Sequence, residues 1–358
     1  MTTWRSTQPV DPIPAGLRTA GMRSRSVVLS LAAAMVVVAA GCGAGPDGGA
    51  AQPPLPPPAE PAVAPPVTAA PAGRVVDVGS VPEGIVADAQ TRTVAVGVRD
   101  PDQLVLLNID SGAITARVPL PGVLRHLQLV GPGGPVLVPD ESADSLLRVA
   151  LPEGTVTSQV ITGTSPHDAT QAPDGTVFVA NEGGGSVVAV RGDEIVKTFT
   201  DVTQPAGLAP VGDTVGLVDV RENTITFYDA DTLSRITELP AGDGPTHVVA
   251  DRHGRMIVTD TRGGQLLVFE PAPEPREVAR VALPGNPYGI TYDPVHDRLW
   301  VTVTAANQVV GYDMTMPTPR EVARIPTVRQ PNTVAVDPTS GQVFVTGTAD
   351  GTVEIINP

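Results

Sequence analysis

The chain has 358 residues, enough for one large domain or two ordinary ones, and its apolar fraction of 41% suffices for a core. A formal net charge of −15 argues against nucleic-acid binding, which needs clustered cations, and against electrostatic docking on anionic lipid. A single cysteine, Cys42, excludes an intrachain disulfide and a cysteine-based metal site.

Residues 1–41 are predicted to be a signal peptide. A short cationic segment, 22–26, precedes the apolar run 27–40. This run of about 14 residues suits the core of a signal peptide and is too short to span a bilayer. Met22 is an alternative start of the chain. If the chain starts at Met1, the N-terminal region of the signal peptide is unusually long.

The leader ends in Ala39-Ala40-Gly41-Cys42, which resembles the bacterial lipobox. That motif usually has leucine at the position of Ala39. The resemblance implies cleavage after Gly41, attachment of diacylglycerol to Cys42, and an acyl chain such as palmitate on the new N-terminus. Two or three acyl chains anchor stably. The chain is therefore expected to be an exported lipoprotein on the extracytoplasmic side of the cell membrane. The alternative is an ordinary secretory signal with a chance cysteine.

Residues 42–73 are predicted to be a lipidated cysteine followed by a disordered tether. The segment contains ten prolines and no hydrophobic periodicity, so it buries too little apolar surface to order itself. At roughly 3 Å per residue it could hold a domain up to about 90 Å from the membrane. A proline-rich tract can also be a ligand for aromatic-groove domains.

From residue 74 the chain repeats at the spacing of a four-stranded blade. Seven short stretches open the units, and their second residues, six of them proline, lie 39 to 44 residues apart. These stretches are VPEGI (81–85), VLRHL (123–127), SPHDA (165–169), QPAGL (204–208), GPTHV (244–248), NPYGI (286–290) and QPNTV (330–334).

Further apolar strands follow in each unit, for example TVFVAN, SVVAVRG and EIVKTFT in the third, with Gly, Asn or Asp between them. The seventh unit ends after three strands, and RVVDV at 74–78 resembles the fourth strands of the others. The predicted fold is therefore all-β: a seven-bladed β-propeller of four-stranded blades over 74–358. Its ring is closed by an N-terminal strand that pairs into the last blade.

The repeat resembles the YVTN-type propeller family of exported bacterial proteins. The similarity rests on VFVAN at 177–181 with GSVVAV at 185–190, and on NTITFYD at 223–229 and NQVVGYD at 307–313. It implies a scaffold that binds a ligand or partner, with function decided by the site rather than the fold. The Trp-Asp signature of WD40 propellers is absent from the sequence.

The residues that follow each opening stretch are predicted to converge at one mouth of the central channel. Three of the five histidines fall in this set. The candidate ligand site consists of Glu83, Arg125, His126, His167, Asp168, His247, Tyr288 and Asn332. Three interpretations stay open: a solvated polar rim, a pocket for a small molecule or partner, and a divalent metal site.

Two functions follow from these features. The first is a non-enzymatic scaffold that binds an envelope protein, a glycan or a small molecule, without a cofactor; specific catalytic motifs are absent from the sequence. The second is a lactonase-like hydrolase that uses a divalent metal, because Glu83-Gly84 resembles the start of the first blade in that family. Asp168 and Asn332 could supply further ligands, and the metal would polarise the ester and activate a water. A quinone or copper redox propeller is disfavoured because the sequence has only two tryptophans, and because three clustered histidines are too few for a multinuclear copper centre.

Overall fold

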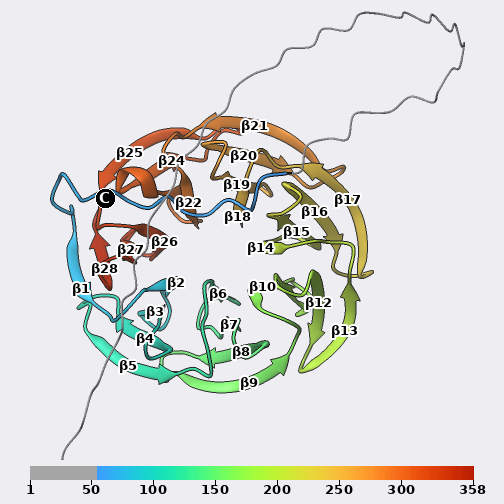
Figure 1. The fold of residues 1–358 in the computed structure, drawn as a ribbon, viewed down its shortest axis with the longest axis horizontal. Coiled ribbons are helices and arrows are strands. Elements are labelled where there is room, and N and C mark those ends of the chain that lie inside the picture. Colours follow the sequence, from blue (N-terminus) through green and yellow to red (C-terminus); the bar gives the residue numbers. More distant parts are fainter. Residues whose placement is uncertain (1–54) are drawn as a thin grey trace, which may run out of the picture. The chain divides into compact units, whose positions relative to one another are not determined.

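The computed structural model describes residues 55–358 and confirms a seven-bladed β-propeller (Figure 1). Seven four-stranded antiparallel sheets surround a central channel. In blades 1 to 6, four consecutive strands run outward from the channel. Within the described residues, the 3₁₀ turn η1 (Thr304–Ala306) is the one helical element, and no helix is long and apolar enough to cross a membrane.

Within each blade the strands follow one another from the channel outward. Blade 1 comprises β2 (Glu83–Asp88), β3 (Thr93–Val98), β4 (Gln103–Asn108) and β5 (Ile114–Pro119). Blade 2 comprises β6 (Gln128–Leu129), β7 (Val136–Asp140), β8 (Ser145–Ala150) and β9 (Thr155–Ile161). Blade 3 comprises β10 (Pro166–Gln171), β11 (Val177–Asn181), β12 (Ser186–Arg191) and β13 (Glu194–Phe199). Blade 4 comprises β14 (Pro205–Val211), β15 (Thr214–Asp219), β16 (Thr224–Asp229) and β17 (Ser234–Pro240). Blade 5 comprises β18 (Pro245–Ala250), β19 (Met256–Asp260), β20 (Gln265–Glu270) and β21 (Arg276–Ala282). Blade 6 comprises β22 (Pro287–Asp293), β23 (Arg298–Val303), β24 (Gln308–Asp313) and β25 (Arg320–Pro326). Blade 7 comprises β26 (Pro331–Val336), β27 (Val343–Gly347), β28 (Thr352–Ile356) and β1 (Arg74–Asp77).

The ring closes as the incomplete seventh unit predicts. Strand β1 pairs antiparallel with β28, and its register joins Arg74 to Ile355 and Asp77 to Thr352. The first and last strands of the propeller therefore share one blade, and backbone hydrogen bonds between them close the ring.

The core lies between neighbouring blades. Strands β3 and β11 are buried along their whole length, because both faces of a blade pack against its neighbours. At the junction of blades 7 and 1, Val94 and Val105 pack with Phe344. This two-sided burial explains why the second strands are nearly continuous apolar runs, whereas the outermost strand β5 is largely exposed.

Blade 2 departs from the expected repeat. Its innermost strand β6 has only two residues and starts after the predicted opening stretch 123–127. Leu124, which stands where the other units have proline, is buried instead against blade 1. A Cβ on Gly97 would lie 2.3 Å from Leu124 Cδ1, so Gly97 provides the space for this side chain. The stretch therefore fills the junction between two blades rather than pairing as a strand.

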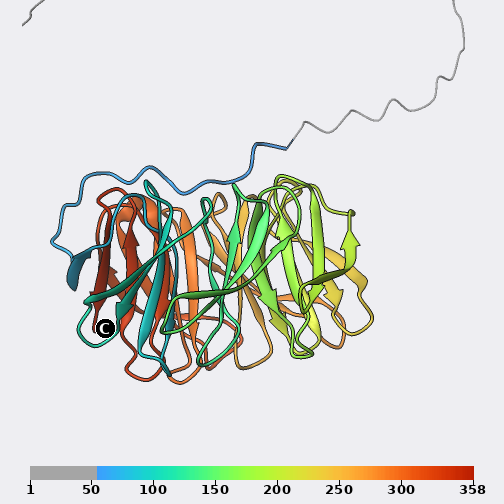
Figure 2. The ribbon, with the colours of Figure 1, turned by 90° about the horizontal axis from the view of Figure 1, so that it is seen from below.

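The proline-rich segment runs along one face of the propeller (Figure 2). Residues 55–66, which we call the strap, are hydrogen-bonded to loops of blades 4 to 7. This differs from the expected disordered tether, because polar side chains of the propeller satisfy the strap backbone. The predicted signal peptide and Cys42 lie outside the described residues.

Candidate functional site at the channel mouth

A bulge near the start of the innermost strand directs the rim side chains. The pairing of the first two strands shifts register between Pro166 and Asp168 in blade 3 and between Pro331 and Val334 in blade 7. A bulge takes a residue out of the alternating pattern and re-aims its side chain. In blade 3 the residue within the bulge is the predicted site residue His167.

Buried acids at the ends of second strands hold the loops that lead into the rim. Asp219 accepts hydrogen bonds from the backbone N–H of Thr203 at 2.6 Å and of Gln204 at 3.2 Å. Asp260 accepts one from Gly244 N–H at 2.8 Å. Each carboxylate satisfies backbone donors that a loop would otherwise leave buried and unpaired, so the entry to the next inner strand is fixed.

Half of the predicted rim residues are buried, and the other four, Glu83, Arg125, His126 and Tyr288, are half-buried. His167, Asp168, His247 and Asn332 are between 3% and 6% exposed. Burying polar groups costs free energy unless they are paired, so their partners define the site. Three groups of contacts, together with the separate Asp168, account for the predicted residues.

The first group is a chain of alternating charges. Arg125 Nε lies 3.2 Å from Glu141 Oε1, and the same oxygen lies 3.3 Å from His167 Nδ1. Glu182 Oε2 lies 2.9 Å from this nitrogen, and Glu182 also accepts a hydrogen bond from Gln204. Two carboxylates therefore share one imidazole.

This arrangement favours a charged His167. Burial alone would lower the pKa of His167, but the carboxylates of Glu141 and Glu182 raise it to about 10. Burial likewise opposes the charge on Glu182, yet the contact with His167 lowers its pKa to about 2. Near neutral pH, a buried imidazolium is thus paired with half-buried carboxylates.

The second group surrounds Glu83. Its carboxylate forms an ion pair with Arg99 and accepts a hydrogen bond from Asn332 Nδ2 at 3.3 Å. Asn332 in turn accepts one from Gln330 at 3.1 Å. Burial raises the pKa of Glu83, although Arg99 counteracts this effect.

The third group is aromatic. His126 Nε2 and His247 Nε2 lie 2.7 Å apart, and Tyr288 packs edge-on against His247 with ring centroids 4.5 Å apart. Burial lowers the pKa of His247 to about 3 and that of His126 well below its usual value. Both rings are therefore neutral, so one donates and the other accepts in their shared hydrogen bond.

Asp168 lies apart from these groups. Its carboxylate accepts hydrogen bonds from the backbone N–H of Ala169 and Leu208, both at 2.8 Å, and from Gln128 at 3.0 Å. Burial raises the pKa of Asp168 to about 6 in spite of these donors. Its oxygens connect blades 2, 3 and 4 rather than joining Glu83.

The prediction missed Arg99, Glu141 and Glu182, which complete the charged groups. Each is the residue directly after a second strand, β3, β7 or β11. A repeat-wise comparison of that position would have found them, because the end of the second strand lies beside the start of the first in an antiparallel blade.

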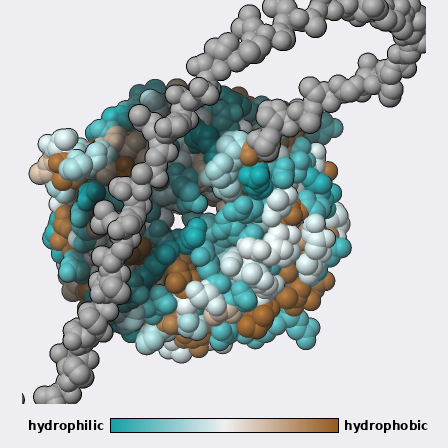
Figure 3. Space-filling view, in the orientation of Figure 1, coloured by the Kyte–Doolittle hydropathy of each residue, from teal (hydrophilic) through white to brown (hydrophobic). Residues whose placement is uncertain are grey.

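The strap covers part of the mouth. A cavity of about 180 Å³ is lined by Glu60 and Pro61 of the strap together with Glu83, Arg99, Arg125 and Tyr288. Hydrophilic residues surround the central opening on this face (Figure 3). The mouth is thus a small charged cavity that the propeller and the strap form together.

The acids and histidine of the first group are the described residues best placed to hold a divalent metal. One ligand atom from each of Glu141, His167 and Glu182 lies within 4.8 Å of the others. A metal there would have to displace the proton of His167 and compete with Arg125 for Glu141. Of the expected set, Glu83 and Asn332 are in contact, but Glu83 is paired with Arg99, and Asp168 accepts hydrogen bonds from backbone N–H groups instead of joining them.

Comparisons with known proteins connect the chain to propellers by fold alone. No protein-family model and no curated protein matches it. Hydrazine synthase of Kuenenia stuttgartiensis superposes with a TM-score of 0.67 at 18% identity, covering 78% of this chain and 96% of that one. A streptogramin B lyase gives 0.66 at 15% identity, covering 80% and 98%. Virginiamycin B lyase from Staphylococcus aureus gives 0.64 at 16% identity, covering 79% and 98%. What the chain shares with these proteins is the propeller fold.

Proposed function

We propose that this chain is a binding scaffold of the YVTN-repeat type, anchored to the cell membrane by lipid on Cys42. Its channel-mouth face would recognise an extended proline- and alanine-rich segment of an envelope protein. The observation that carries this proposal is the strap, a segment of that composition already seated on the face.

Side chains of the propeller contact the strap backbone as a binding site contacts an extended peptide. Gln330 accepts a hydrogen bond from Ala64 N–H and donates one to the Ala62 carbonyl, both at 2.8 Å. Thr304 Oγ1 accepts one from Ala62 N–H at 3.0 Å, and Asn307 donates one to the Pro65 carbonyl at 2.8 Å. The paired contacts of Gln330 imitate the pattern of a neighbouring strand.

Basic side chains hold the other end of the strap. Arg221 donates a hydrogen bond to the Pro56 carbonyl at 3.1 Å, and Arg262 donates one to the Pro57 carbonyl. Because prolines lack an N–H, a proline-rich segment forms few hydrogen bonds within itself, and its carbonyl groups are free to accept them from the propeller. Because prolines also favour an extended conformation, the segment loses little conformational entropy when it binds. Such contacts select a proline-rich backbone rather than particular side chains.

One position adds a size requirement. Ala64 is 2% exposed, whereas its neighbour Val63 is 90% exposed. A larger or charged side chain at position 64 would collide with the propeller or be buried without a partner. The Ala64→Asp substitution should therefore release the strap while leaving the blades intact.

We test recognition with a fluorescent peptide of residues 55–66 added to the full-length chain. Wild-type protein should bind it weakly, since the covalently linked strap competes at high effective concentration. The Ala64→Asp protein should bind it at least about tenfold more tightly in fluorescence anisotropy. The same peptide with aspartate in place of Ala64 is the matched control. A further Gln330→Ala substitution should weaken binding again, and equal binding of both peptides would refute the proposal.

The anchor is tested separately by labelling cells with an alkyne-bearing fatty acid. Wild-type chain should incorporate the label and sediment with membranes, whereas Cys42→Ser should lose the label and appear in the soluble fraction. Retention of Cys42→Ser on membranes would show that another segment anchors the chain. Peptide binding does not depend on this result.

A further inference from the structure

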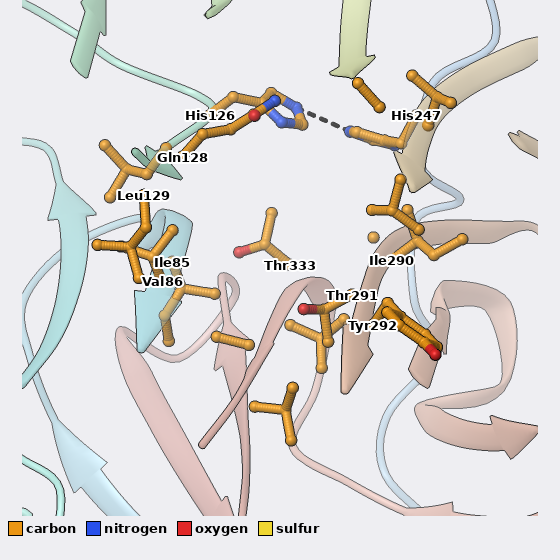
Figure 4. A pocket seen from close by; sticks show the side chains of 18 of the residues that line it. Ile85, Val86, His126, Gln128, Leu129, His247, Ile290, Thr291, Tyr292 and Thr333 are labelled. Atoms are coloured by element: carbon orange, nitrogen blue, oxygen red, sulfur yellow. Dashed lines mark hydrogen bonds between the residues drawn. The ribbon is translucent and has the colours of Figure 1, made fainter. Parts of the chain in front are cut away.

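A second cavity of about 400 Å³ lies within the channel. The innermost strands form its wall, and half-buried apolar side chains line it, among them Val249. Val86, Leu129 and Ile290 are further members of this lining (Figure 4). This volume falls within the range of about 300–1,000 Å³ that is usual for small-molecule sites.

One end of this cavity is polar. The hydrogen bond of 2.7 Å between His126 and His247 crosses the channel from blade 2 to blade 5 (Figure 4). Among the residues that the structure describes, His247 Nδ1 is buried without a hydrogen-bond partner. Two neutral imidazoles can offer an N–H donor and a lone pair to a ligand in exchange for their mutual bond.

The wall offers no free counter-charge for an ionised ligand. Within this described part of the chain, no lysine or arginine lines the cavity, and Asp168 is its only acidic residue. The oxygens of Asp168 already accept hydrogen bonds from Leu208 N–H, Ala169 N–H and Gln128. A charged ligand would lose its hydration without compensation, so the cavity favours neutral molecules.

We infer that the channel binds a neutral, elongated small molecule. Its apolar body would lie against the wall, and one carbonyl, hydroxyl or amide group would hydrogen-bond to His126 and His247. The wall of this site belongs to the innermost strands, whereas His126 and His247 at its polar end also line the cavities beneath the strap. The inference holds whether or not the propeller recognises peptides.

The first test uses Nile red, a neutral, elongated dye with one carbonyl, and the full-length chain in detergent below its micelle concentration. We expect a blue-shifted emission that saturates at one dye per chain, with a dissociation constant below about 10 µM. The anionic dye 8-anilinonaphthalene-1-sulfonate should bind at least about tenfold more weakly. Unsaturable binding, or equal affinity for the anionic dye, would overturn the inference.

Substitutions then locate the dye. Ile290→Trp fills the cavity and should weaken binding at least about tenfold, and Val249→Phe serves if that variant does not fold by circular dichroism. Val295→Trp is the matched control, because Val295 is 62% exposed outside the cavity. His247→Leu removes the polar end and should weaken binding by about three- to tenfold. A folded cavity-filling variant that binds Nile red like the wild type would show that the dye binds elsewhere.

Discussion

Replacing Arg255 by alanine is expected to lower the free energy of unfolding by about 3–5 kcal/mol. Arg255 is 4% exposed, and its Nε lies 2.6 Å from Asp251 Oδ2. Its remaining donors bond the carbonyl oxygens of Met314 at 2.5 Å and Met316 at 2.6 Å. Because these carbonyls belong to the blade 6 loop before β25, the guanidinium joins blades 5 and 6. Its loss would leave a buried carboxylate and two carbonyls without this donor.

Urea titration of both proteins measures this difference. Arg320→Ala is the matched control, since Arg320 forms a similar ion pair with Asp313 at 3.0 Å but has a side chain that is 72% exposed. Exposed pairs contribute about 0–1 kcal/mol, so the control should unfold almost as the wild type does. Equal effects of the two substitutions would mean that the buried pair does not hold the two blades together.

Deleting residues 74–77 should destabilise the propeller by about 2–5 kcal/mol and promote aggregation. The deletion removes β1, leaves the edge of β28 unpaired and exposes the core against which Val76 packs. It also disturbs Gly73, whose N–H donates a 2.7 Å hydrogen bond to the fully buried Glu354. Glu354 further accepts a hydrogen bond from Val328 N–H, so the closure is connected to the loop before β26.

Thermal melting and light scattering report this effect. A deletion of residues 43–46 shortens the chain equally outside the described residues and should leave the melting temperature unchanged. An identical melting curve for the 74–77 deletion would contradict the role of β1 in ring closure.

The sequence was sufficient to predict the architecture and part of the site. The spacing of the opening stretches defines the number of blades, and the missing fourth strand of the last unit predicts the pairing of β1 with β28. The convergence of His126, His167 and His247 follows from their common position in the repeat. The contacts of His167 with Glu141 and Glu182 were not predicted, because these acids follow the second strands of blades 2 and 3 and carry no motif.

The strap was not predicted for a different physical reason. Hydrophobic patterning detects segments that bury their own side chains, whereas the strap is held mainly through its backbone carbonyl and N–H groups. The amides and guanidinium groups that bind it are spread over four blades. Neither the sequence of the strap nor that of the propeller therefore contains a local pattern that predicts this contact.

The strap also determines how far the propeller can move from the proposed anchor. With the strap seated, 13 residues separate Cys42 from Pro56, and they span about 40 Å at most at roughly 3 Å per residue. With the strap released, the free chain extends to Ala72, where hydrogen bonds of Ala72 and Gly73 hold it to the propeller, and it reaches about 90 Å. The volume that the propeller can search grows as the cube of this distance, about tenfold. A partner that displaces the strap would thereby lengthen the free segment between Cys42 and the propeller. The propeller could then reach more distant layers of the envelope.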